Sequence, residues 1–516
     1  MEFINKNLIL IAITAFFSAL LSIWSVYVDP IINMDATLYL SAAQEFTNGK
    51  IENAFALYKW PFYSALIAGI HSLSGLSLQS SAHLINGVLQ AITSIGFLAC
   101  IHAIGGNKRT LLIAALVILL FPSISKYRAF IIRDAGFIAC YLWALYYLLR
   151  GLNSYRPVFF ILSGITMIFG TLFRIEAVAP LTIIPAYLLY LHSKTAVFRG
   201  LWLLLTTTFS LVLFCGLSIW LFGEASIIRS VGLADFFANS MQQALNSLNL
   251  RIEIIQDKVL NIFSEKYAPM VLIITVILIV AYETIRRLAF FYAYLAWYAL
   301  RHKLVLNHKL IRKTFFALCI IQLALMAIFA TINMFLVSRH TLALVLTVLL
   351  LTPFSIDHLL KKWQTGNDKS AKWSVPVLIV FLLAIGIDGL NVRTNKHDIV
   401  QAGEWVKENI DPRYSLYSNN GLLMHYANRK PAYYNLQFNW EEADFMMVTN
   451  QIFDFDFVVF EIKRSDTKAE EYINQKLLNT PFAKRKLHSN KLLLIYDLRQ
   501  QSPNQALDSS YLKISG

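Results

Sequence analysis

The sequence predicts an α-helical protein that crosses a membrane many times and ends in a small α/β domain. Of its 516 residues, 57% are hydrophobic and only 15% are charged, and the mean hydropathy is +0.54. Soluble domains carry about 25% charged residues. Apolar runs of about 20 residues, the length that crosses a bilayer, recur along the first three quarters of the chain. After about Val392 the composition turns polar.

Eleven apolar segments are long enough to serve as transmembrane helices. Their predicted ranges are 8–28, 82–104, 109–124, 134–149, 157–173, 176–192, 200–222, 268–286, 314–336, 340–360 and 373–390. Leu8–Val28 contains no charge, and no small-residue cleavage site follows it. We therefore expect an uncleaved signal-anchor at the N-terminus.

Basic residues predict the orientation, because the inside loops of membrane proteins are enriched in Lys and Arg. With the N-terminus inside, most basic residues fall in inside loops, and the largest cluster runs from Arg286 to Lys313. An odd number of spans then places the C-terminus outside. The net charge of +14 has the same explanation. We therefore expect the lipid bilayer as a partner and no nucleic acid.

Two outer loops, 29–81 and 223–267, separate spans. Within the first, Trp60–Leu76 contains Pro61, and a crossing there would turn every later basic loop outward, so we predict a helix lying in the outer interface. The second loop has apolar residues at helical spacing and is predicted to form one or two helices along the outer surface. Segment 288–300 fits either an inside interfacial helix or a prolongation of the preceding span.

The chain is predicted to divide into a transmembrane module, residues 1–390, and an extracytoplasmic α/β domain, residues 391–516. Helix and strand patterns alternate in the second part: helices at Asp398–Asn409 and Asn420–Ala427, strands at Ser415–Tyr417, Phe455–Glu461 and Lys491–Tyr496. About 120 residues are enough for a core. The C-terminal domain has no nucleotide-binding glycine loop, and the four cysteines lack metal-ligand spacing, so we expect no cofactor and no metal.

Charged residues at the outer ends of the spans are the candidates for chemistry. In the first loop Asp35 opens a helix, Tyr39 follows one turn later, and Lys59 precedes the interfacial helix. The later spans contribute Arg128, Arg133, Asp134, Arg174, Glu176, Arg339 and His340. Charges at the membrane edge are costly, so they are usually paired or functional. Simple structural roles stay open: an N-cap for Asp35, a snorkelling side chain for Lys59 and an ion pair for Arg133 and Asp134.

Cations gathered beside carboxylates on one side of a membrane suit an anionic, phosphate-bearing ligand. A carboxylate among them can act as a general base towards a hydroxyl.

The arrangement resembles the GT-C membrane glycosyltransferases, and among them glycosyltransferase family 39, with its protein O-mannosyltransferases and lipid A aminoarabinose transferases. The resemblance rests on Asp35 with Tyr39, Lys59-Trp60-Pro61, Asp134, Arg339 and the run Ala402–Ile410. His340 stands where a Tyr is frequent. Ala36 stands where family members often carry a second acid, which departs from a metal-binding or paired-carboxylate site.

The resemblance implies a hexosyl- or pentosyltransferase of the bacterial inner membrane, with its N-terminus in the cytoplasm. It would move a sugar from a polyprenyl-phosphate-linked donor to a lipid, glycan or protein acceptor on the outer face. Asp35 would be the general base of an inverting reaction, and Lys59, Arg128, Arg133, Arg174 and Arg339 would hold the departing lipid phosphate.

Two alternatives to this function remain open. One is an O-antigen polymerase or ligase, an enzyme class that concentrates its chemistry in a large later loop. The other is a transporter or flippase of an anionic lipid-linked glycan, for which an inverted repeat is expected.

Overall fold

The computed structural model describes residues 2–58, 60–154, 156–177, 233–365, 369–390, 397–429, 440–487 and 490–499, with a few positions between 179 and 202. The chain divides into two compact units. One comprises Met1–Tyr27 and Ala82–Val392, and the other comprises Val28–Ser81 and Arg393–Gly516. The second unit thus joins the first outer loop to the C-terminal region.

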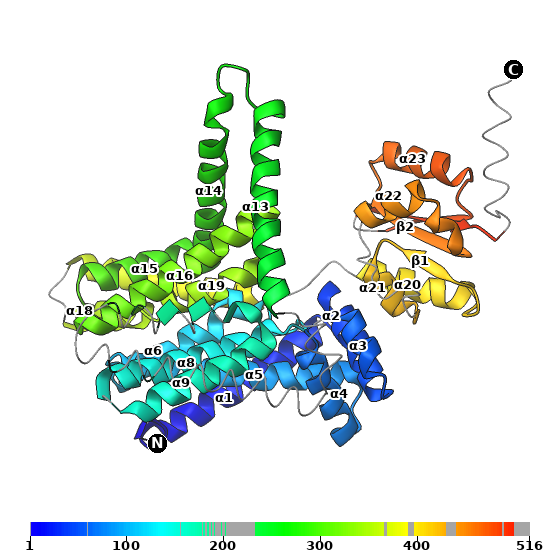
Figure 1. Cartoon of the computed structure of the whole chain (residues 1–516). Helices are drawn as coiled ribbons and strands as arrows, with labels where there is room; N and C mark the ends of the chain where they lie inside the picture. The colour runs from blue at the N-terminus through cyan, green and yellow to red at the C-terminus, as the bar shows by residue number, and fades with distance from the viewer. Residues whose placement is uncertain are drawn as a thin grey trace, which may run out of the picture. The chain divides into compact units, whose positions relative to one another are not determined.

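The first unit is a helical bundle (Figure 1). Its helices are α1 (Glu2–Val28), α5 (Leu78–Ala103), α6 (Lys108–Leu120), α7 (Pro122–Ser125), α8 (Asp134–Ser154), α9 (Pro157–Phe173), α13 (Leu233–Lys258), α14 (Ala268–Leu288), α15 (Phe290–Arg301), α16 (Lys309–Asn333), α17 (Leu342–Leu349), α18 (Thr352–Thr365) and α19 (Lys369–Leu390), with the 3-10 turns η1 (Ile175–Ala177), η2 (Glu265–Tyr267) and η3 (Ser338–Thr341).

Among the described residues, seven helical segments are long and apolar enough to cross a membrane, and α9 is a shorter apolar helix. This makes the chain a multi-pass membrane protein. The predicted span 200–222 and most of the predicted span 176–192 lie outside the described residues.

Proline ends the helix predicted over 109–124. Phe121 is extended (φ −69°, ψ 118°), as is common for a residue before proline, and α6 ends at Leu120. Pro122 then opens the short helix α7. Two helices therefore replace the predicted single span.

Segment 288–300 forms a separate helix, α15, and is not a prolongation of the preceding span. Ala289 has φ +57°, which separates α14 from α15. Tyr292, Leu295 and Ala299 of α15 are buried in the main core of the bundle, where the Tyr292 ring meets Phe121 edge-on at 5.3 Å. Only part of the aromatic content is buried in this way, because Phe290, Tyr294 and Trp297 of the same helix are exposed.

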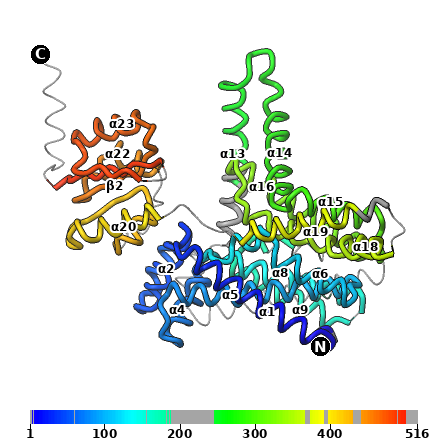
Figure 2. Tube along the Cα trace, turned by 180° about the vertical axis from the view of Figure 1, so that it is seen from behind, coloured from blue at the N-terminus to red at the C-terminus, as the bar shows by residue number. Residues whose placement is uncertain are grey.

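Helices α13 and α14 form a hairpin that projects from the bundle and runs across its neighbouring helices (Figures 1 and 2). The helix predicted in the second outer loop is present as α13. Leu248, Ile252 and Ile255, at helical spacing, pack against the core shared by α14 and α16.

The second unit contains α2 (Met34–Thr47), α3 (Ile51–Leu57) and α4 (Phe62–Ser74) from the first loop, where α4 is the helix predicted over Trp60–Leu76. Its C-terminal part contains α20 (His397–Asn409), β1 (Leu416–Ser418), α21 (Gly421–Tyr426), α22 (Trp440–Val448), the 3-10 turn η4 (Gln451–Asp454), β2 (Phe457–Lys463), α23 (Thr467–Leu477), β3 (Ala483–Lys486) and β4 (Lys491–Asp497).

The C-terminal part is the predicted small α/β domain. Its sheet has the order β1-β2-β4-β3, with β1 parallel to β2 and the other pairs antiparallel. The central strands read FVVFEIK and KLLLIYD, apolar runs that suit burial on both faces. The predicted fold class, a polytopic helical membrane protein with a small C-terminal α/β domain, is confirmed.

Candidate active site

Small residues bring the N-terminal end of α8 and the C-terminal end of α9 together. A Cβ added at Gly136 of α8 would overlap the Phe173 ring at the end of α9, and one at Gly170 would lie 3.3 Å from Cys140. At the opposite end of the pair, a Cβ added at Gly151 would lie 2.8 Å from the Phe160 ring. Such small residues let membrane helices approach closely. The approach places the first residue of α8 next to the residue that follows α9.

Those two residues, Asp134 and Arg174, form a buried ion pair that extends to a second acid. The Arg174 guanidinium donates through Nη1 to Asp134 Oδ1. Nη2 donates to Glu176 Oε1 at 2.6 Å and Nε to Oε2 at 3.3 Å, a bidentate contact. The Asp134 and Arg174 side chains are only 3% and 7% exposed, whereas that of Glu176 is 39% exposed. Every nitrogen of the guanidinium is thus used to hold two carboxylates from different elements.

Further charged groups surround this pair from neighbouring segments. Arg133 and Arg339 both act electrostatically on the Asp134 carboxyl. His340, beside Arg339 in η3, lies within the field of Asp134, Arg174 and Glu176 and stacks on Phe329 at 4.0 Å. Arg133 and Arg339 are only partly buried. Three guanidinium groups therefore lie in the neighbourhood of two carboxylates, which makes the cluster net positive, with partly exposed cations at its edge.

The irregular segment before α8 is hydrogen-bonded to η3 and to α5. Tyr127 is hydrogen-bonded to Ser338 of η3, and Asn86 of α5 donates to the Phe130 carbonyl. These bonds hold the segment that leads into Arg133 and Asp134. We infer that the charged cluster is preorganised by its supporting shell.

Arg128 points away from this cluster. It is 1% exposed, and its Nη1 donates to the Ser18 carbonyl at 2.9 Å, to Ser18 Oγ at 3.1 Å and to Ser22 Oγ at 3.2 Å. The guanidinium therefore fastens the segment to α1. Arg128 was predicted to bind the phosphate together with Arg133, and the structure places its guanidinium against α1.

The cavity beside Asp134 is small. It has a volume of about 10 Å³ and is lined by Gln90, Thr93, Tyr127 and Asp134, among others. That is roughly the room of a single water molecule. A ligand phosphate would meet the cluster at its partly exposed edge, where Arg133, Arg339 and Glu176 lie, and not through this cavity.

Of the first-loop candidates, two lie on α2 and one is outside the described residues. Asp35 is in the first turn of α2, where the helix dipole favours a carboxylate. Tyr39 is buried in an aromatic cluster, with its ring 5.3 Å from both Tyr58 and Tyr63. Lys59 is the candidate outside the described residues.

Sequence reasoning did not relate Arg287 to the segment before α8. Arg287 was grouped with the inside basic loop, yet its carbonyl accepts a hydrogen bond from Ser123 at 2.7 Å and its charge acts on Tyr127. Its side chain pairs with Glu283 at 3.5 Å. Arg287 was assigned to an inside loop from its position in a basic cluster, and that pattern carries no information on its contact with Ser123.

Comparisons with known proteins agree with this architecture. Residues 59–220 match the family model described as dolichyl-phosphate-mannose-protein mannosyltransferase. No curated protein matches the chain at a significant level.

Two solved structures of oligosaccharyltransferases from Archaeoglobus fulgidus share the fold. One, a complex with Zn and sulfate, is 13% identical, with a TM-score of 0.55 over 89% of this chain and 69% of that chain. The other, AglB with an inhibitory peptide and a dolichol-phosphate, is 11% identical, with a TM-score of 0.54 over 97% of this chain and 75% of that chain. The predicted resemblance to GT-C membrane glycosyltransferases is confirmed.

Proposed function

We propose that this chain, a membrane glycosyltransferase of the GT-C type, moves a sugar from a polyprenyl-phosphate-linked donor to an acceptor hydroxyl or phosphate on the outer face of the membrane. The observation that carries the proposal is the net positive cluster around Arg174, with Arg133 and Arg339 partly exposed at its edge. A similar fold has been solved with a dolichol-phosphate, a lipid phosphate of the same chemical class.

The cluster suits the leaving group of this reaction. As the bond between the anomeric carbon and the phosphate oxygen breaks, negative charge grows on the lipid phosphate. Guanidinium groups held in place before the reaction stabilise that charge without reorganising. The buried pair of Asp134 and Arg174 forms the centre of the cluster, and the partly exposed Arg133 and Arg339 are the groups proposed to contact the phosphate.

Asp35 is proposed as the general base. An acceptor hydroxyl attacks the anomeric carbon from the face opposite the phosphate, so the configuration inverts. The hydroxyl proton passes to the Asp35 carboxylate, and the electron pair of the broken bond leaves with the lipid phosphate. The position of Asp35 in the first turn of α2, one turn before Tyr39, supports this role.

Substitution of Asp35 tests the proposal. Membranes or nanodiscs containing the full chain are supplied with polyprenyl-phosphate-linked hexoses, and release of polyprenyl phosphate is measured. General-base action contributes about 10²–10⁴-fold, so Asp35→Asn is expected to lose activity on that scale. Asp466→Asn is the matched control, because Asp466 is also a helix N-terminal acid, on α23, and accepts from Ala469 N at 3.1 Å. Asp35→Asn with more than about a third of wild-type turnover would place the base elsewhere.

Substitution of Arg339 tests the phosphate site separately. A charge-assisted contact is worth about 1.5–3 kcal/mol, so Arg339→Ala is expected to lower the efficiency of donor use roughly 10- to 100-fold. Arg413→Ala removes an exposed ion pair with Asp411 and is expected to leave turnover unchanged. Equal donor kinetics in wild type and Arg339→Ala would assign Arg339 a structural role. Donor translocation without release of polyprenyl phosphate would favour the transporter alternative.

A further inference from the structure

The C-terminal domain makes a direct contact with the segment that carries Asp35. Within the compact unit of residues 28–81 and 393–516, α21 packs against α2. The backbone N–H of Ile32 donates to the Tyr426 hydroxyl at 3.2 Å. Ile32 is 1% exposed and lies in the short non-helical segment that leads into α2. A phenol from the far end of the chain therefore satisfies a buried amide just before the candidate catalytic helix.

The first turn of α21 is anchored to the sheet. Asn419 exchanges two hydrogen bonds with the Glu461 backbone: Nδ2 donates to the carbonyl at 3.0 Å, and Oδ1 accepts from the N–H at 2.8 Å. Asn420 donates to the Glu461 carboxylate and caps α21 by accepting from Leu422 N at 2.9 Å. Lys491 of β4 pairs with the same carboxylate. These bonds fix the start of α21 relative to β2.

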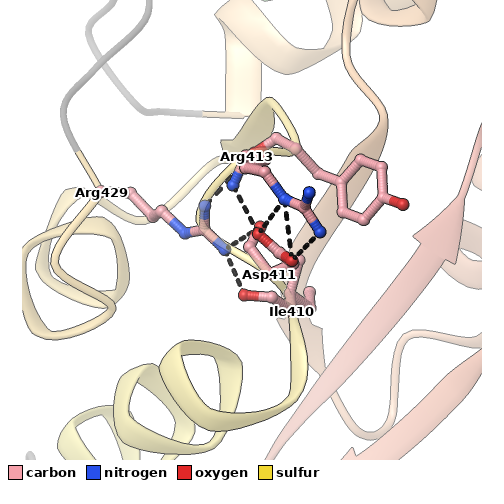
Figure 3. A network of polar contacts seen from close by, with 5 residues as sticks. Ile410, Asp411, Arg413 and Arg429 are labelled. Atoms are coloured by element: carbon pink, nitrogen blue, oxygen red, sulfur yellow. Dashed lines mark hydrogen bonds and ion pairs between the residues drawn. The ribbon is translucent and has the colours of Figure 1, made fainter.

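The end of α21 is anchored to α20. The Arg429 guanidinium, just past α21, donates to the carbonyls of Ile410, Asp411 and Tyr414, the last two at 3.0 and 3.3 Å. Figure 3 shows this guanidinium directed at the chain that leaves α20, next to Arg413, whose guanidinium pairs with the Asp411 carboxylate. One side chain thus satisfies three backbone carbonyls of the turn that follows α20.

A glycine sets how closely α20 approaches Tyr426. A Cβ added at Gly403 of α20 would lie 2.6 Å from Tyr426 Cβ, 3.0 Å from the Leu423 carbonyl oxygen and 3.1 Å from Ala427 N. Only glycine allows this spacing. Tyr426 is therefore held from the sheet, from the end of α20 and from the middle of α20.

We propose that the C-terminal domain braces the first outer loop, and that Tyr426 is a positioning residue for Asp35. This inference rests on the proposed role of Asp35 as the base. Loss of the Tyr426 hydroxyl frees the Ile32 amide and lets the first turn of α2 shift. A base must lie within hydrogen-bond reach of the proton that it removes, so a small shift of the carboxylate slows the reaction.

Hydrogen exchange tests the brace without reference to catalysis. In the full chain in nanodiscs, Tyr426→Phe keeps the ring and removes only the acceptor. Peptides covering residues 29–40 are expected to exchange faster in this variant than in wild type. Tyr472→Phe is the matched control, because it loses a phenol hydrogen bond to Asp444 inside the same domain and is expected to leave those peptides unchanged. Equal exchange of residues 29–40 in wild type and Tyr426→Phe overturns the brace, whatever the fate of the proposed function.

A double-mutant cycle then tests whether Tyr426 acts through Asp35. Release of polyprenyl phosphate from polyprenyl-phosphate-linked hexoses is measured again. Tyr426→Phe is expected to lower kcat about 2- to 10-fold with an unchanged donor KM, because one neutral hydrogen bond is lost. In an Asp35→Asn background the same change is expected to cost nothing further. An unchanged kcat, or an equal loss in both backgrounds, overturns the positioning role. High activity of Asp35→Asn itself overturns the assignment of the base and with it this role, while faster exchange in Tyr426→Phe would still support the brace.

Discussion

Replacing Arg174 by methionine should separate the structural from the catalytic part of the charged cluster. Arg174→Met removes the partner of Asp134, whose side chain is 3% exposed, and of Glu176, whose side chain is 39% exposed. Breaking a buried ion pair from one side costs about 3–5 kcal/mol, because a buried charge is left unpaired. The exposed partner adds at most about 1 kcal/mol. Since Arg133 and Arg339 also act on the Asp134 carboxyl, we expect a loss near the lower limit, about 3 kcal/mol.

The second half of the experiment removes the stranded charge. In the double variant Asp134→Leu with Arg174→Met, the buried pair is replaced by apolar side chains, which is often neutral for stability. Stability is measured by denaturant titration of the detergent-solubilised full chain. The double variant is expected to regain most of the lost stability while staying inactive in the polyprenyl phosphate release assay. A loss below about 1 kcal/mol in Arg174→Met would refute the buried pair, and full activity of the double variant would remove the pair from the site.

Three further outcomes follow from the packing, the burial and the topology. Gly136→Ala is expected to lower the free energy of unfolding by about 1–3 kcal/mol, because the new methyl overlaps the Phe173 ring. The control Gly69→Ala should not destabilise the chain, because an added Cβ there meets nothing within 4 Å. Equal stability of the two variants would disprove the close approach of α8 and α9. Burial lowers the pKa of His425, so the folded state favours the neutral imidazole, and stability should fall as pH drops below the unfolded-state pKa of about 6.5. Hydrogen exchange of the C-terminal domain at pH 5 and pH 8 measures this loss. The same pH dependence in His425→Gln as in wild type would contradict it. A cysteine replacing Ser465 should react with an impermeant thiol reagent in intact cells if the C-terminal domain is outside, and labelling only after lysis would reverse the orientation.

The sequence predicted the elements that depend on local composition. Transfer of an apolar stretch into a bilayer depends on its own side chains, so α1, α5, α8 and α16 were identified from hydropathy. The C-terminal strands β2 and β4 were recognisable because each is a short, nearly continuous apolar run. The break between α14 and α15 was not recognisable, because the conformation of Ala289 is set by packing rather than by residue type.

The sequence also located the charged candidates, but not their partners. Arg128, Arg133 and Arg174 look equivalent in a hydropathy profile, since each is a single cation at the end of an apolar run. In the structure Arg174 pairs with Asp134, forty positions away in the chain, whereas Arg128 donates to Ser18 and Ser22. Which way a guanidinium turns depends on acceptors from distant helices, and no local pattern encodes them.

By itself the sequence determined that this chain is a multi-pass membrane protein and which residue types stand at the ends of its apolar stretches, because transfer free energy is a property of each segment alone. Tertiary structure decided which charges meet. The approach of α8 and α9 through Gly136 created the pair of Asp134 and Arg174, and folding of the chain brought Tyr426 to Ile32 across 394 positions. Both contacts depend on how closely the packed helices approach one another, and that distance is set by the fit of many side chains at once.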